Sequence, residues 1–186
     1  MYSPEEKQFL LALARRAIEH YFDTGKVLKV GAGEITSEKL KDKLACFVTL
    51  TIGRQLRGCI GHILPVQELY LDVIENAVSA AFEDPRFNPL SKEEFDKIKI
   101  EISVLTVPAP LKFSTPEELI KKLRPKIDGV ILKRGRQQAT FLPQVWEELS
   151  NPKEFLGHLC LKAGLEEECW RRDLNVETYQ AEAFSE

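Results

Sequence analysis

Hydrophobic residues recur every three or four positions in three stretches of the chain, the spacing of a helix with one buried face. The first stretch follows Ser3 and ends near Gly25, the second covers residues 69–82, and the third runs from Asn151 to Gly164. In the first stretch the apolar positions are Phe9, Leu10, Leu13, Ala14, Ala17, Ile18, Tyr21 and Phe22. We therefore predict three amphipathic helices, each packed on one side against a core.

Other stretches alternate apolar and polar residues, which is the pattern of a half-buried strand. The alternation is clearest in residues 46–52 and 98–104. Residues 129–133 and 138–142 are separated by a short basic turn that contains glycine, so they predict a hairpin. Residues 176–184 predict one final strand.

Four helix starts share one device, a capping residue followed three positions later by glutamate. The pairs are Ser3 with Glu6, Ser91 with Glu94, Thr115 with Glu118 and Asn151 with Glu154. In such a capping box the two side chains satisfy backbone N–H groups that the first helical turn leaves free. Three of the pairs also place proline at the first helical position, where its missing N–H costs nothing.

The order of these elements predicts the fold class. Strands follow one another without a regularly alternating helix, which favours an α+β fold with a mainly antiparallel sheet and packed helices over a doubly wound sheet. A length of 186 residues fits a single domain over residues 1–186, and 44% hydrophobic residues supply material for a core.

Charge and composition argue against several classes of partner. The formal net charge is −3, and the basic residues form only short, interrupted clusters. We therefore expect no nucleic-acid partner. Arg15, Arg16 and Glu19 interrupt the first apolar stretch, so we predict neither a signal peptide nor contact with a membrane.

The four cysteines occupy positions 46, 59, 160 and 169, without a C-x-x-C pair, and the three histidines are scattered. No spacing resembles a zinc site, and we expect neither a metal nor another cofactor. Reduced thiols in the cytoplasm are then the default expectation. We interpret Cys46, Cys160 and Cys169 as small packing residues.

The stretch LRGCIGH, residues 56–62, is the main candidate for chemistry. In an extended strand, Leu56, Ile60 and His62 share one face, and Arg57, Cys59 and Ile63 share the other. Alternation thus turns His62 away from Cys59 and disfavours a Cys–His pair. Arg57 is the better local cation to activate the Cys59 thiol.

Glycines stand on both sides of this cysteine, at Gly58 and Gly61. Without a Cβ atom they either let another backbone pack closely or leave the thiol and its peptide groups open to a ligand. The sequence leaves both interpretations open.

The loop DPRFNPL, residues 84–90, combines two prolines with Asp84, Arg86 and Phe87 between a predicted helix and a predicted strand. Such a rigid loop either caps a site or is a structural turn held by an Asp84–Arg86 contact.

Several segments together resemble the AMMECR domain family over roughly residues 44–186. In chain order they are ACFVTL, LRGCIG, DPRFNPL, EISVLT, DGVIL, TFLPQVWEE, FL...C.KAGL and the closing W...VETY. LRGCIG is the hallmark of that family, and it covers Leu56 to Gly61. His62 lies outside the hallmark, at a position where we expect other members to carry a small polar residue.

The resemblance implies an α+β fold with a larger lobe built from both chain termini, a smaller lobe, and a cleft between them. It also implies that prokaryotic relatives are often encoded beside a radical-SAM enzyme and a Memo-like protein. The family has no settled activity.

Three hypotheses about function follow. The leading one is a cytoplasmic accessory domain that binds a small-molecule ligand or a protein partner and acts with a radical-SAM enzyme and a Memo-like protein. Its expected binding residues are Arg57, Gly58, Cys59, Gly61, Asp84 and Arg86. The second is an enzyme with Cys59 as nucleophile and Arg57 as its activating cation. The third is a non-catalytic interaction scaffold.

Overall fold

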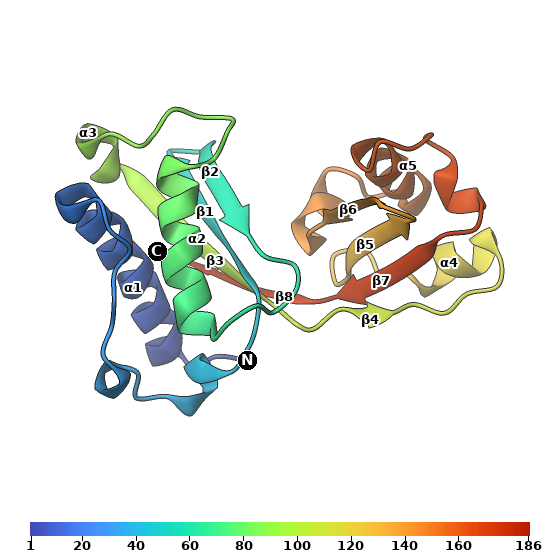
Figure 1. Cartoon of the computed structure of the whole chain (residues 1–186). Coiled ribbons are helices and arrows are strands. Elements are labelled where there is room, and N and C mark those ends of the chain that lie inside the picture. Colours follow the sequence, from blue (N-terminus) through green and yellow to red (C-terminus); the bar gives the residue numbers. More distant parts are fainter. The chain divides into compact units, whose positions relative to one another are not determined.

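The computed structural model describes the backbone of residues 1–186 and every side chain except that of Ala32. Within these residues the chain divides into two compact units. The first comprises Met1–Val107 and Glu182–Glu186, and the second comprises Pro108–Ala181. Each unit contains a four-stranded sheet together with helices (Figure 1). The predicted class, helices packed with mainly antiparallel sheet, is confirmed.

The first unit carries the hallmark stretch. Its strands are β1 (Cys46–Ile52), β2 (Gln55–Gly61), β3 (Ile98–Leu105) and β8 (Ala181–Ser185), in the sheet order β2-β1-β3-β8. Its helices are α1 (Pro4–Thr24), α2 (Leu69–Phe82) and the single turn α3 (Lys92–Phe95), with 3₁₀ turns η1 (Ala32–Glu34) and η2 (Glu38–Lys41). β1 pairs antiparallel with both β2 and β3.

The core of the first unit forms where the predicted periodicities meet. Helices α1 and α2 lie against the same face of the sheet (Figure 1). The apolar residues Cys46, Val48 and Leu50 of β1 point into this core with less than 1% of their surface exposed. Helix α1 begins at the Ser3–Glu6 capping box and ends at Gly25, whose φ of 65° is a conformation that suits glycine.

The second unit is built on its own sheet, with strand order β4-β7-β5-β6. The strands are β4 (Ala109–Pro110), β5 (Gly129–Arg134), β6 (Gln137–Phe141) and β7 (Asn175–Tyr179); the helical elements are α4 (Pro116–Lys122), η3 (Pro143–Glu147), α5 (Pro152–Lys162) and η4 (Cys169–Arg171). Trp146 stacks on Phe155 with ring centroids 3.7 Å apart, and its indole N–H donates to the Asp128 carbonyl at 2.7 Å. A separate apolar core therefore holds this unit together.

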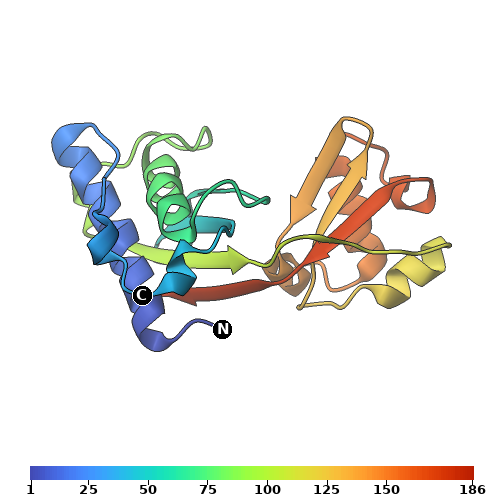
Figure 2. The same ribbon diagram turned by 60° about the horizontal axis from the view of Figure 1, so that its bottom comes forward.

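Two details of the predicted elements are wrong. The single strand expected over residues 176–184 is two strands, β7 and β8, which belong to different sheets and are separated by Gln180 (Figure 2). Two of the four expected capping boxes are also incomplete: the Asn151 side chain accepts from the N–H of Lys153, and the Glu118 side chain accepts from the N–H of Ser114 instead of that of Thr115. Alternation in the sequence shows that a segment is extended, but it does not show which strand will pair with it.

The interpretation of Cys160 and Cys169 as reduced packing residues is also wrong, because they form a disulfide. Helix α5 ends near Gly164, and the chain turns back so that η4 brings Cys169 to a Cα–Cα distance of 5.9 Å from Cys160. Both residues are fully buried in the core of the second unit. Cys46 and Cys59 carry free thiols.

In the described part of the chain, no helix combines the length and the apolar character that crossing a bilayer requires.

Candidate functional site

The hallmark stretch forms β2, a strand at the edge of the first sheet (Figure 1). Leu50 of β1 pairs with Gly58, but the next residue, Thr51, pairs with Leu56, so Arg57 is an extra residue in a β-bulge. The bulge shifts the alternation, and Leu56 lies on the face of Thr51 and Cys59. The prediction that it shares a face with Ile60 is therefore wrong.

The two glycines of the hallmark are explained by close backbone packing. A Cβ atom on Gly58 would lie 2.0 Å from the carbonyl oxygen of Ala80 in α2. A Cβ atom on Gly61 would lie 2.4 Å from the carbonyl oxygen of Cys46. Of the two interpretations that the sequence left open, the structure favours the approach of protein backbone at both positions.

The backbone of Cys59 is fixed by the DPRFNPL loop. The Cys59 N–H donates to Asp84 Oδ2 at 2.8 Å, and Arg86 Nη2 donates to the Cys59 carbonyl at 3.2 Å. Arg86 and Asp84 are also paired, with Nη2 2.7 Å from Oδ2 and Nε 2.9 Å from Oδ1. The loop thus binds the outward-facing N–H and C=O of Cys59, much as another strand would.

Asp84 is 4% exposed although its partner Arg86 reaches solvent. Hydrogen bonds from Arg86 hold the pKa of the Asp84 carboxyl well below its ordinary value, and the N–H of Cys59 contributes in the same direction. The carboxylate is therefore a permanent acceptor for the Cys59 backbone. The predicted Asp84–Arg86 contact exists and holds the strand edge.

Arg57 is bound to a partner that the sequence did not suggest. Its Nε and Nη2 atoms donate to the two carboxylate oxygens of Glu94 at 2.8 and 2.9 Å, and Nη2 also donates to the Asn88 carbonyl. These hydrogen bonds lower the pKa of Glu94 to about 2. The Arg57 guanidinium therefore fastens β2 to α3, and its described hydrogen bonds go to these groups.

The Cys59 side chain lies on the sheet face opposite the helices, in a row of three polar residues. Thr49 of β1 pairs with Cys59 on one side and with Glu101 of β3 on the other. The Thr49 hydroxyl donates to Cys59 Sγ at 3.3 Å. Burial raises the pKa of the Glu101 carboxyl above its ordinary value. The row combines a half-buried thiol, a hydroxyl and a carboxyl that holds its proton more tightly than usual.

His62 lies on the other side of the sheet, as strand alternation predicts. Its Nδ1 is 2.7 Å from Asp72 Oδ1, and Asp72 Oδ2 accepts from the Cys46 N–H and from Asn76 Nδ2, both at 2.9 Å. Asp72, Asn76 and Cys46 are almost completely buried. Burial, together with nearby Asp72, raises the pKa of the Cys46 thiol well above its ordinary value.

Sequence reasoning missed Thr49, Glu101, Glu94 and Asp72. One signal was available for Asp72, because it and Asn76 are polar residues four positions apart within an otherwise apolar helix face. Thr49 and Glu101 needed the strand register, which no local pattern in the sequence supplies. Among the residues whose side chains are described, no three His, Cys, Asp or Glu side chains gather as metal ligands would.

Comparison with known proteins assigns the chain to a family. The model of the AMMECR1 family matches residues 11–184. A protein of Thermofilum pendens is 40% identical over 99% of this chain and 91% of its own length, and one of Thermococcus gammatolerans is 42% identical over 96% and 89%.

A solved structure supports the same assignment. The crystal structure of the uncharacterized protein PH0010 from Pyrococcus horikoshii is similar with a TM-score of 0.89 and 40% sequence identity, over 97% of this chain and 91% of that one. The fold and the sequence match therefore agree over nearly the whole chain, which belongs to the AMMECR1 family.

Proposed function

We propose that this chain is a binding domain whose recognition surface is the sheet face around Cys59. The observation that carries the proposal is the row formed by Cys59, Thr49 and Glu101. Three polar groups of different chemistry stand side by side on a rigid sheet, and the backbone beneath the thiol is fixed by Asp84 and Arg86. Preorganised groups lose little freedom when they bind a ligand.

The residues expected to bind divide into two roles under this proposal. Cys59 is the residue that meets the ligand. Gly58 and Gly61 let β2 pack against α2 and β1, while Arg57, Asp84 and Arg86 hold the strand in place. The ligand is a small molecule or peptide. It offers hydrogen-bond donors and acceptors to the Thr49 hydroxyl and the Glu101 carboxyl, and a soft or electrophilic atom to the Cys59 thiol.

The proposal extends to partners and location. We assign the domain to a cytoplasmic system with a radical-SAM enzyme and a Memo-like protein, on the ground of the family resemblance. Cytoplasmic disulfides persist mainly in heat-adapted archaea and bacteria. The Cys160–Cys169 disulfide therefore agrees with a cytoplasmic location only on the condition that the source organism is heat-adapted. Thiol trapping of freshly lysed source cells tests it: a fully reduced pair would remove the condition, and a chain found only outside the cytoplasm would contradict the location.

Binding is tested by a thermal-shift screen of metabolites against the wild type and the variants Cys59→Ser and Glu101→Gln. A true ligand raises the unfolding temperature of the wild type, and the rise is smaller in both variants. The matched control is Glu19→Gln, which removes one carboxylate from an exposed position on α1 and leaves the response intact. A ligand that stabilises all four proteins equally binds elsewhere and contradicts the proposal.

Partner binding is tested with the purified radical-SAM and Memo-like proteins of the same organism. Thr49→Lys places a long cation in the middle of the row and should abolish binding, whereas an exposed change on α1 such as Glu19→Gln should not. Equal binding by both variants would place the contact away from the Cys59 face.

One observation favours a second candidate function, an enzyme with Cys59 as nucleophile. The hydroxyl of Thr49 donates to Sγ, which fixes the position of the sulfur on the sheet face. Labelling with a thiol reagent at different pH values tests this candidate, since a reactive cysteine reacts well below the ordinary thiol pKa of about 8.5. Labelling that follows the ordinary value, or complete protection, argues for a non-catalytic role.

A further inference from the structure

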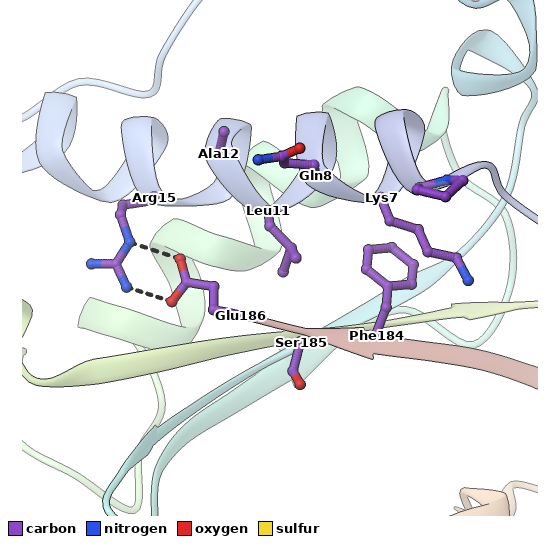
Figure 3. Close-up of a pocket in the computed structure, with 9 residues that line it drawn as sticks. Lys7, Gln8, Leu11, Ala12, Arg15, Phe184, Ser185 and Glu186 are labelled. Carbon is purple, nitrogen blue, oxygen red and sulfur yellow. Dashed lines mark hydrogen bonds and ion pairs between the residues drawn. The ribbon is translucent and has the colours of Figure 1, made fainter.

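A groove runs between α1 and β8 on the side of the first unit remote from β2 (Figure 3). Its volume is about 590 Å³. Leu11 of α1 and Phe184 of β8 point toward one another across it (Figure 3). An ion pair stands near each end: Lys7 Nζ is 2.8 Å from Glu182 Oε1, and Arg15 Nη2 is 2.6 Å from Glu186 Oε2. The groove is thus apolar in the middle, and its charges are paired within the chain.

The strand beside this groove is the last in its sheet, and no other strand among the described residues pairs with its outer edge. The N–H of Glu186 donates to the Ile100 carbonyl of β3 at 3.2 Å. Because backbone groups alternate along a strand, Ala183 and Ser185 direct their N–H and C=O groups away from β3. Both residues are exposed. Exposed, unpaired strand edges are sites at which another strand adds.

We propose that this edge is the interface of a symmetric dimer, in which β8 pairs antiparallel with β8 of a second copy of the chain. The two-fold axis passes through Ala183, the central residue of the strand. Ala183 then faces its own counterpart, and Ala181 faces Ser185 of the other copy. Ala181, Ala183 and Ser185 all direct their backbone N–H and C=O groups outward, so the two strands can form backbone hydrogen bonds with each other along their whole length.

Charge and shape favour a second copy as the occupant. In this register Glu182 lies opposite Phe184 of the other copy; the two Glu182 side chains are diagonal neighbours, and the charge of each is paired with Lys7 of its own chain. The two Phe184 rings become diagonal neighbours at the mouths of the grooves, within the reach of aromatic side chains. A closed two-fold contact also uses up both open edges and leaves none for further growth. The proposal is independent of the function assigned to the Cys59 face.

The first test is the mass of the full chain in solution over a range of concentrations, by analytical ultracentrifugation. The wild type should be a dimer, and Ala183→Pro should dissociate about 30-fold more readily, because the Ala183 pair exchanges two backbone hydrogen bonds that proline cannot donate. Ala183→Ser keeps the N–H and is the matched control. A wild type that is monomeric at every concentration overturns the proposal.

Two further variants test the proposal even if the Ala183→Pro protein does not fold. Ala12→Glu places a carboxylate on an exposed position at the groove. It should also weaken the dimer, because the Phe184 rings of the two copies meet at the mouths of the grooves. In a Cys59→Ser background, Ala183→Cys should form a disulfide between copies, because directly paired residues bring their Cα atoms to about 5.5 Å. Ser185→Cys faces Ala181 and should not. A dimer that survives Ala12→Glu and crosslinks at neither position forms through another surface and contradicts the proposal.

Discussion

Two buried aspartates stand at opposite ends of α2, and each accepts a backbone N–H from a strand of the first sheet. Asp72, in the first turn, accepts from Cys46, and Asp84, just beyond the last turn, accepts from Cys59. Their surroundings differ. The Cys46 N–H and the Asn76 amide that bind Asp72 lie in the core, whereas the main partner of Asp84 is Arg86, whose side chain is 53% exposed.

This difference shows that burial of a carboxylate alone does not decide how much the fold depends on it. The Cys46 N–H and the Asn76 amide beside Asp72 are buried, so water cannot replace the carboxylate as their acceptor if it is removed. Arg86 can turn into solvent if Asp84 is removed, and only the backbone donors of the loop and strand lose their acceptor. Each carboxylate accepts a backbone N–H of the sheet, and we expect the fold to depend more on Asp72 than on Asp84.

The largest expected effect comes from Asp72→Ala. It leaves the buried Cys46 N–H without its carboxylate acceptor, removes one of the acceptors of the Asn76 amide and leaves a small cavity, so the free energy of unfolding should fall by about 4 kcal/mol. Urea denaturation followed by circular dichroism measures the loss. A loss smaller than that of Asp84→Ala would reverse the comparison.

The next effect comes from the last turn of the same helix, where the backbone of Ala80 packs against Gly58 of β2. Gly58→Ala forces a methyl group against the Ala80 carbonyl, and we expect a loss of about 2–3 kcal/mol. The matched control is Gly53→Ala in the β1–β2 turn, where a Cβ atom meets nothing within 4 Å but the φ of 63° strains the backbone. A Gly58→Ala protein as stable as wild type would mean that α2 and β2 separate readily.

Asp84→Ala should cost less, about 2 kcal/mol, because Arg86 becomes solvated. It should also free the backbone of Cys59, so hydrogen exchange at that amide should accelerate by more than the change in global stability explains. Unchanged exchange at Cys59 would mean that the DPRFNPL loop does not hold the strand edge.

The smallest effect concerns Arg57 and Glu94, a partly exposed ion pair. The pKa of Glu94 is lowered from 4.5 to about 2, so the pair contributes fully above pH 4.5 and its contribution disappears as the pH falls toward 2. Glu94→Gln should therefore lower the unfolding temperature slightly at neutral pH, and the difference from wild type should shrink through this interval. A difference independent of pH would show that charge is not the cause.

Local patterns in the sequence predicted most of the elements. The Ser3 and Ser91 capping boxes and the spacing of apolar residues placed helix starts correctly, because those interactions span only a few residues. The final strand was misjudged because Gln180 does not interrupt the alternation on either side of it. The partners of β7 and β8 are set by residues far away in the sequence.

In the candidate site, too, local patterns were predicted and contacts between distant segments were not. Cys59 and the Asp84–Arg86 contact could be proposed from two short stretches, since each stretch carries its own chemistry. The bulge at Arg57, its pairing with Glu94 and the row through Thr49 depend on strand register and on contacts between distant segments. The disulfide was missed because a separation of nine residues does not reveal that the chain turns back after α5.

The insertion of the second unit between β3 and β8 also has a consequence for the order in which the chain folds. Strand β8 cannot join the first sheet until the intervening residues have been made, and closing so long a flexible loop costs entropy. Within the second unit, however, Ala109 pairs with Thr178. Once that unit has folded, roughly seventy residues act as a short, stiff connection. Folding of the second unit therefore brings β8 closer to β3. Variants that slow the folding of the second unit should delay completion of the first sheet.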